Sequence, residues 1–159
     1  MRNQKLIPGS IFKVKLEDNF HAYGRILNNG DCAFYDYKID YEELDLKKII
    51  LQKIIFTAIV VVSEIKKGRW PIIGHLDLEE RFKNSPKYQL QSIASNHYRI
   101  IDNGLLRNST AEECEGLEFG FVWEAHHIEE RINDFYLGRP NEHIEAFKKL
   151  RQQFINANS

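Results

Sequence analysis

The sequence predicts an α+β fold, in which the first three-quarters of the chain forms a mainly antiparallel, strongly twisted sheet with short helices, and a pair of helices ends the chain. Segments with the alternating or continuous apolar residues of strands lie between residues 10 and 123, whereas two segments with apolar residues at helical spacing lie between residues 125 and 155. Strands that come first and helices that come last are typical of α+β proteins.

The composition is that of one soluble globular domain spanning residues 1–159. Hydrophobic residues make up 43% and charged residues 28% of the chain, and a chain of this length buries about two-thirds of the surface that it exposes when unfolded. The longest apolar run, residues 54–62, is too short to cross a membrane, and the N-terminus lacks the apolar segment of a secretion signal. Cys32 and Cys114 form no motif, which fits a reducing compartment. We therefore expect a cytoplasmic protein that does not bind a membrane.

The first three strands are predicted around a hairpin. Residues 10–16 alternate between apolar and charged side chains, which indicates a half-buried strand. Residues 21–27 and 31–37 flank Asn28-Asn29-Gly30, whose residues tolerate the positive φ of a tight hairpin turn. Gly24 lies within the strand predicted over residues 21–27, where a glycine costs stability unless a bulge or a large neighbour needs the space.

The middle of the chain is organised around a turn. Asp40 and Glu43 have capping-box spacing, which predicts a helix over residues 41–50, and the apolar run 54–62 predicts a buried strand. Gly68-Arg69-Trp70-Pro71-Ile72-Ile73-Gly74 then predicts a turn, with Trp70 as a core residue whose indole N–H finds a partner. Arg69 has two candidate contacts, an ion pair with Glu118 or stacking on Trp70.

The remaining elements follow from similar signals. Asp77 and Glu80 predict a short helix that ends before Pro86, and residues 88–93 and 97–101 read as two strands. A capping box at residues 110–113 precedes Gly116, which predicts a short helix, and residues 117–123 form a final strand. Two amphipathic helices follow, and the first ends at Gly138 and Pro140.

No common catalytic or cofactor-binding motif occurs in the sequence, and we predict no catalytic residue, bound metal or cofactor. The best candidate for chemistry is the pair His126 and Glu130, one helical turn apart, which would serve a small metal-dependent hydrolase. The alternative is that both lie on the solvated face of an amphipathic helix, because Ile128 and Ile132 already account for its buried stripe.

An acidic and aromatic segment, residues 35–45, includes the start of the predicted helix over residues 41–50. It is either a solvated loop and helix start, where the helix dipole favours acidic residues, or a docking surface for a basic partner. Tyrosines beside charges are typical of binding hot spots. The candidate partner-binding residues are Tyr35, Asp36, Tyr37, Asp40, Tyr41, Glu42, Glu43 and Asp45.

A nucleic-acid adaptor is the third functional class considered. Its candidate contacts are Lys66, Lys67, Arg69 and residues 148–151. With 22 Lys and Arg against 23 Asp and Glu, the net charge of −1 does not provide the positive field on which nucleic-acid binding relies. We therefore expect no direct contact with nucleic acid.

Five short motifs together resemble the immunity protein 26 family. They are Gly9-x-Ile-Phe-x-Val, Tyr23-Gly24-Arg25, the turn Gly68–Gly74, Gly116-Leu117-Glu118 and Glu129-Glu130-Arg131. The resemblance spans about Gly9 to Tyr136, and the helix over residues 139–159 lies outside it as an individual addition. The positions that mark the family here are Gly24, Gly68, Arg69, Trp70, Pro71, Gly74 and Glu118.

The resemblance implies a small bacterial protein that protects a cell from a toxin of a polymorphic or contact-dependent system. Such a protein is a cytoplasmic, non-enzymatic inhibitor, which binds the C-terminal domain of its cognate toxin and blocks the active site or the substrate. An acidic aromatic surface would then face a basic, nuclease-type toxin, since charge complementarity speeds association.

Overall fold

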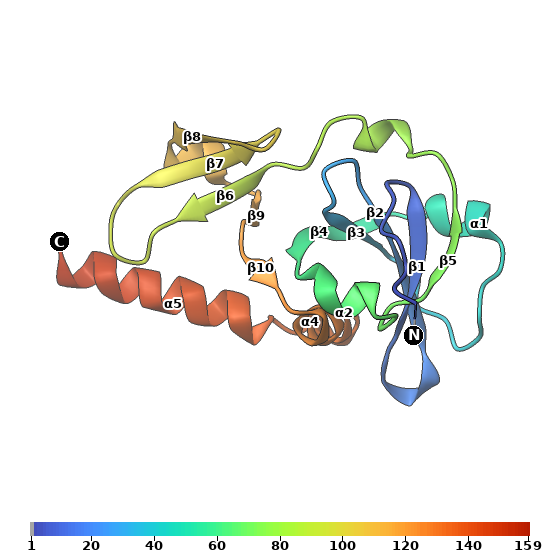
Figure 1. Cartoon of the computed structure of the whole chain (residues 1–159). Helices are drawn as coiled ribbons and strands as arrows, with labels where there is room; N and C mark the ends of the chain where they lie inside the picture. The colour runs from blue at the N-terminus through green and yellow to red at the C-terminus, as the bar shows by residue number, and fades with distance from the viewer. Residues whose placement is uncertain (1) are drawn as a thin grey trace.

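Two separate sheets form the framework of the computed structural model, which describes residues 2–159 (Figure 1). The first sheet has the strand order β10-β4-β3-β2-β1-β5 and consists of β1 (Ser10–Lys15), β2 (His21–Ile26), β3 (Cys32–Tyr35), β4 (Ile54–Val60), β5 (Ile72–His75) and β10 (Val122–Trp123). The second has the order β8-β7-β6-β9 and consists of β6 (Tyr88–Gln91), β7 (Tyr98–Asp102), β8 (Leu105–Ser109) and β9 (Glu118–Phe119).

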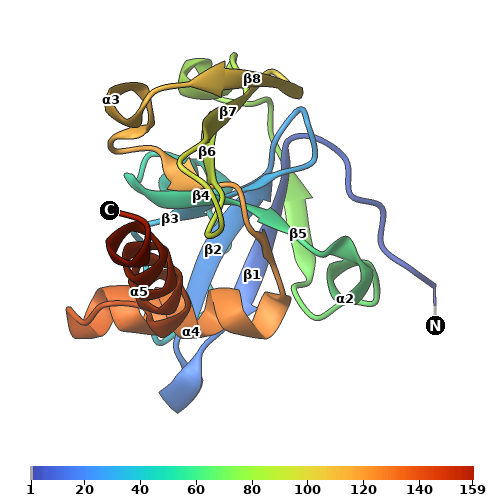
Figure 2. The ribbon, with the colours of Figure 1, turned by 90° about the vertical axis from the view of Figure 1, so that its left-hand side faces the viewer.

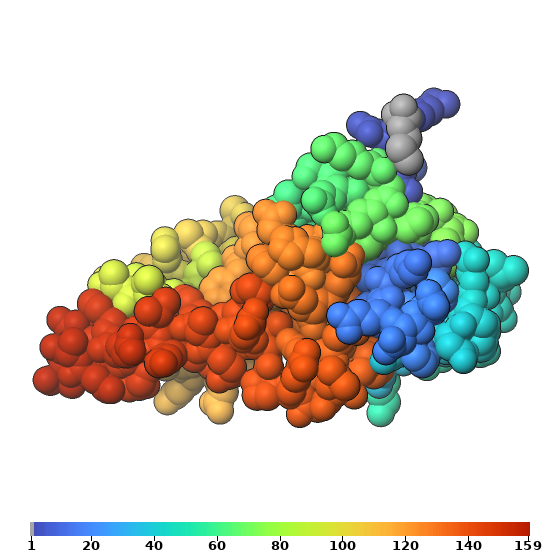
Figure 3. Space-filling view, turned by 90° about the horizontal axis from the view of Figure 1, so that it is seen from below, coloured from blue at the N-terminus to red at the C-terminus, as the bar shows by residue number. Residues whose placement is uncertain are grey.

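The helices are short except for the last two. The α-helices are α1 (Leu46–Ile50), α2 (Val62–Lys66), α3 (Ala111–Cys114), α4 (Ala125–Leu137) and α5 (Glu142–Ala157), and the 3₁₀ helices are η1 (Glu17–Asn19) and η2 (Glu80–Phe82). In Figure 2, α4 lies below the first sheet while the second sheet lies above it. Figure 3 shows α4, in orange, between α5, in red, and the N-terminal part of the chain, in blue. Within residues 2–159, every helix is too short or too polar to cross a bilayer.

The predicted α+β class is confirmed, but the prediction of one mainly antiparallel sheet is wrong. There are two sheets, and both are mixed, because β10 pairs with β4 in parallel and β9 pairs with β6 in parallel. The predicted strand over residues 117–123 provides both of these edge strands. The chain leaves the second sheet at Gly120, whose N–H donates to the carbonyl of Gln89, and it then joins the first sheet.

The first sheet is covered on both faces. Phe12 and Val14 of β1 point into the larger core, together with Trp70 and with Ile128 and Ile132 of α4. This core also includes Phe34, Phe56 and Trp123. Ile11 points to the opposite face and packs with Tyr23, Tyr35 and Ile49 of α1. The strand that the sequence predicts as half-buried is therefore enclosed by helices on both sides.

Trp70 is the centre of the larger core. Its ring is fully buried, stacks on Phe12 at a centroid distance of 5.2 Å and meets Phe34 edge-on at 5.6 Å. Gly24 makes room for this arrangement, since a Cβ at that position would lie 2.5 Å from the Phe12 ring and 2.6 Å from the carbonyl oxygen of Ala33. A large neighbour is therefore the reason for a glycine within β2.

Other local predictions differ from the structure in instructive ways. The helix expected over residues 41–50 starts only at Leu46, and its N-cap is Asp45 rather than Asp40. The apolar run 54–62 ends as a strand at Val60, and α2 follows directly. Strand β8 has no sequence signal, because four of its five side chains are exposed and no buried face imposes an alternating pattern.

The predicted cap signals of the second half are confirmed. Thr110 forms the predicted capping box with Glu113 at the start of α3. Asn103 and Gly104 adopt the positive φ values, 49° and 75°, that a hairpin turn between β7 and β8 requires. Gly138 ends α4 in the left-handed conformation, with φ of 66°.

Candidate partner-binding surface

The eight predicted partner-binding residues divide into buried and exposed members. Tyr35 is fully buried at the end of β3, and its hydroxyl donates to Glu79 at 2.6 Å. Glu43 is only 8% exposed. Tyr37 is half-buried and donates its hydroxyl to Glu43 at 2.7 Å. These three side chains therefore contact the interior of the protein.

Glu43 explains why no helix forms over residues 41–44. Its backbone N–H donates to the Tyr23 hydroxyl at 2.8 Å, and its carboxylate accepts from the backbone N–H groups of Leu44 and Asp45. Lys48 adds an ion pair at 2.9 Å. The hydrogen bond from Tyr37 and the contact with Lys48 lower the pKa of Glu43 from its ordinary value of 4.5 to about 2. Residues 41–44 are thus anchored to the sheet by Glu43, the residue that the capping-box spacing placed in a helix.

The remaining acids lie at the surface. Asp45 accepts hydrogen bonds from the backbone N–H groups of Lys47 and Lys48, so it caps α1. Glu42 is exposed and pairs with Lys13 at 2.6 Å. Asp36 and Asp40 are exposed. Because Lys13 and Lys48 offset part of the negative charge, the surface is less acidic than the sequence of the segment indicates.

Apolar side chains accompany these acids. Leu44 is 81% exposed between Glu43 and Asp45, and Tyr41 is 52% exposed. Sequence reasoning missed Leu44, and its only signal was a leucine flanked by acids outside any apolar pattern. We define the exposed acidic surface as Asp36, Asp40, Tyr41, Glu42, Leu44 and Asp45.

The family-marker residues of the glycine-tryptophan turn hold α4 to the first sheet. The Trp70 indole N–H donates to Glu129 Oε1 at 2.9 Å. Arg69 binds the same carboxylate through Nε at 2.9 Å and Nη2 at 3.0 Å, and it also pairs with Glu64 at 3.0 Å. Neither contact expected for Arg69 is the one found. The indole partner is a carboxylate, which fits the prediction that the N–H would be satisfied.

The other marker residues also make contacts within the fold. Gly68 ends the α2 segment with φ of 96°, and the Pro71 carbonyl accepts a hydrogen bond from the backbone N–H of Lys13 at 3.0 Å. Gly74 packs against Leu46 of α1. Glu118 pairs with Arg131 of α4 through both carboxylate oxygens, at 2.8 and 2.9 Å.

The predicted pair His126 and Glu130 lies along α4, and both side chains line a pocket of about 510 Å³ beside Arg69. The group of residues that converges with metal-ligand spacing shares Glu130 with this pair but does not include His126. His127, Glu130 and His143 each offer a ligand atom within 4.8 Å of the other two. Within residues 2–159, His126 is outside this cluster. The chain reversal at Pro140, which the helical pattern alone does not describe, brings His143 to α4.

Both arginines considered for nucleic-acid contact have partners within the protein. Arg69 is held by Glu129 and Glu64, as described above. Arg151 is the buried residue of α5, and its Nη1 donates to the carbonyls of Ser92 and Ser95 while its guanidinium lies 4.7 Å from the Tyr98 ring centroid. Both residues therefore stabilise the fold.

Comparison with known proteins finds a protein family that this chain matches. A family model described as immunity protein 26 matches residues 7–111, from just before β1 to the first residue of α3. The match includes the exposed acidic surface and the glycine-tryptophan turn, and it ends before Glu118, α4 and α5. The sequence resemblance extends further, because it includes Glu118 and most of α4. No match was found among curated proteins or among solved structures.

Proposed function

The chain belongs to the immunity protein 26 family, and on this premise we propose that it binds a cognate bacterial toxin domain and neutralises it by stoichiometric, non-covalent inhibition. The single observation that carries the proposal is the family match over residues 7–111. The protein acts in the cytoplasm, without catalysis of its own, on the C-terminal domain of a toxin from a polymorphic or contact-dependent system.

The exposed acidic surface is the proposed contact with the toxin. It combines the carboxylates of Asp36, Asp40 and Glu42 with the accessible side chains of Tyr41 and Leu44. Apolar side chains ringed by charges are suited to a protein interface, in which the apolar groups contribute affinity and the charges set the association rate. A basic toxin such as a nuclease has the complementary charge.

The immunity role predicts that this chain rescues cells from the toxin domain encoded immediately upstream of its gene. Expression of that domain alone should stop growth, and co-expression with this chain should restore it because the inhibitor occupies the toxin at equal stoichiometry. Growth assays and size-exclusion chromatography of the mixed, purified proteins measure both effects. A folded protein that neither rescues growth nor forms a complex would contradict the role.

The proposed contact surface predicts a specific loss on charge reversal. The triple variant Asp36→Lys, Asp40→Lys, Glu42→Lys should slow association with the toxin by about tenfold or more at low salt, because electrostatic steering accelerates association by factors of about 10 to 1000. Stopped-flow association rates at several salt concentrations measure this. These acids cap no helix, so the variant should fold.

The matched control reverses three exposed acids elsewhere, Glu80, Glu112 and Glu115. It carries the same change in net charge, so a loss common to both variants would reflect total charge rather than a contact. If the triple variant and the control associate equally fast, the exposed acidic surface is not the interface, and the immunity role stands on the rescue result alone.

A further inference from the structure

Two helices that follow one another in the chain bring two histidines and a carboxylate together. His127 and Glu130 belong to α4, and His143 lies in the first turn of α5. The ring centroids of His127 and His143 are 4.0 Å apart, and His143 Nε2 lies 3.3 Å from Glu130 Oε2. One ligand atom from each residue lies within 4.8 Å of the other two.

The corner between the helices is built to hold this geometry. Asp134 of α4 is buried and accepts hydrogen bonds from Arg139 Nε at 2.5 Å and from Asn141 Nδ2 at 2.9 Å. The same Asn141 caps α5 by accepting from the backbone N–H groups of His143 and Ile144. The position of His143 relative to α4 is therefore set by buried polar contacts and not by a free loop.

The spacing suits a tetrahedral ion. Zinc binds histidine nitrogen and carboxylate oxygen at about 2.0–2.1 Å, so neighbouring ligand atoms in a tetrahedral site lie about 3.3 Å apart. The His143–Glu130 distance already has this value.

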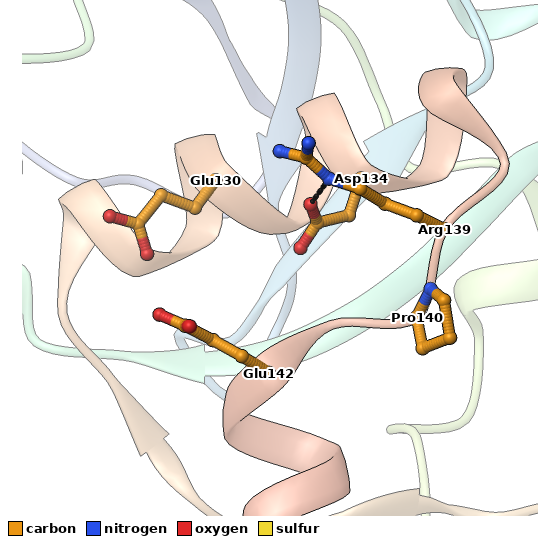
Figure 4. Close-up of a pocket in the computed structure, with 5 residues that line it drawn as sticks. All are labelled: Glu130, Asp134, Arg139, Pro140 and Glu142. Atoms are coloured by element: carbon orange, nitrogen blue, oxygen red, sulfur yellow. Dashed lines mark hydrogen bonds and ion pairs between the residues drawn. The ribbon is translucent and has the colours of Figure 1, made fainter.

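The neighbouring charges also favour a cation. Figure 4 shows the carboxylates of Glu130 and Glu142 on the same side of a pocket between α4 and α5, which is also lined by Asp134, Arg139 and Pro140. Arg139 is engaged by Asp134 in this pocket. The Glu142 carboxylate lies 3.9 Å from His143 Nε2. Two carboxylates, those of Glu130 and Glu142, therefore lie beside the imidazoles of the cluster, and their negative charge favours a bound cation.

We propose that His127, Glu130 and His143 bind a divalent transition-metal ion of the zinc class, which ties the start of α5 to α4. The fourth coordination position is left for water or for Glu142. Helix α5 packs beside the second sheet through Phe147, whose ring centroid lies 5.1 Å from that of Phe119 and 4.7 Å from that of Phe121. The ion therefore strengthens the connection between this helix and the first sheet, on which α4 packs. The site lies beyond residue 111, outside the residues that the family model matches.

The test is a titration of the full chain, purified without a histidine tag and treated with a chelator, with ZnCl₂ by calorimetry at neutral pH. One equivalent of Zn²⁺ should bind and raise the melting temperature, because an ion that binds only the folded protein stabilises it. Mg²⁺ should do neither, since it prefers all-oxygen octahedral sites. The variants His143→Ala and Glu130→Gln should weaken zinc binding at least tenfold relative to the native chain.

The matched control is His126→Ala. It removes a histidine of α4 that is adjacent to His127 but does not belong to the cluster. Melting curves in chelator establish that each variant folds as the native chain does. The inference stands if His143→Ala weakens zinc binding at least tenfold more than His126→Ala. A smaller difference, or no saturable zinc binding by the native chain, overturns it.

Discussion

Replacement of Trp70 by alanine is expected to lower the free energy of unfolding by about 3–5 kcal/mol, the range measured for large aromatic residues truncated in protein cores. The ring is fully buried between Phe12 and Phe34, so its loss leaves a cavity that the rigid strands around it cannot fill. The variant also loses the indole hydrogen bond to Glu129, which connects the turn to α4. Urea unfolding followed by far-UV circular dichroism measures the change.

Two further variants separate the causes of this loss. Trp70→Phe keeps an aromatic ring in the core but removes the N–H donor, so its free energy of unfolding should lie between those of the native chain and Trp70→Ala. Leu105→Ala truncates a side chain that is 75% exposed in β8, and it should change stability by less than about 0.5 kcal/mol. A comparable effect of Trp70→Ala and Leu105→Ala would refute the assignment of Trp70 as the centre of the core.

Replacement of Arg25 by methionine is the second change for which we expect a large effect, about 3–5 kcal/mol, because it removes the fully buried cation that pairs with a mostly buried carboxylate. Arg25 is fully buried in β2 and pairs with Glu79 at 2.6 Å. It also donates to the carbonyl oxygens of Gly9, Leu76 and Asp77. These contacts attach the segment after β5 to the first sheet. Urea unfolding at pH 7 measures the loss.

The control is Arg81→Met, since Arg81 also contacts Glu79, at 3.2 Å, but from a side chain that is 38% exposed. An exposed ion pair contributes at most about 1 kcal/mol. The double variant Arg25→Met, Glu79→Gln should lose less than the sum of its single variants, because residues in direct contact do not act additively. Strict additivity would mean that the two side chains are not coupled.

The same pair predicts a dependence on pH. Burial opposes ionisation of Glu79, but the hydrogen bond from Tyr35 and the charge of Arg25 outweigh it, so the pKa of Glu79 is lowered in the fold. A lowered folded pKa gives stability that is present above the unfolded value, about 4.3, and lost as the pH falls through the folded pKa. The difference in stability between the native chain and Arg25→Met should therefore shrink below about pH 4.

Signals carried by neighbouring residues were enough to predict several parts of this protein. The hairpin at Gly30, the capping box at Thr110 and the end of α4 at Gly138 follow from the backbone preferences of a few neighbouring residues. The burial of Trp70 follows from its size and its place beside the longest apolar run. The family resemblance also rests on short motifs, such as Gly68–Gly74, and the match over residues 7–111 confirms the family.

Capping spacing failed at residues 40–45 because a tertiary contact outcompeted it. Glu43 has the spacing of a helix-capping residue, yet Tyr23, Tyr37 and Lys48 hold it against the sheet, and Asp45 takes over as the cap. The candidate partner-binding residues are separated in the same way. Tyr35 and Glu43 lie inside, whereas Leu44 lies outside, because the direction of each side chain depends on the path of the chain over the sheet.

The sequence by itself determined the α+β class, the main turns, the two final helices and the family. Only the tertiary structure decided that the strands divide into two mixed sheets, that Arg69 pairs with Glu129 and that His143 joins His127 and Glu130. The physical reason is the range of the interactions. Turns and caps depend on residues a few positions apart, whereas these contacts join residues that become neighbours only when chain reversals, such as the one at Pro140, have set the directions of the helices and strands.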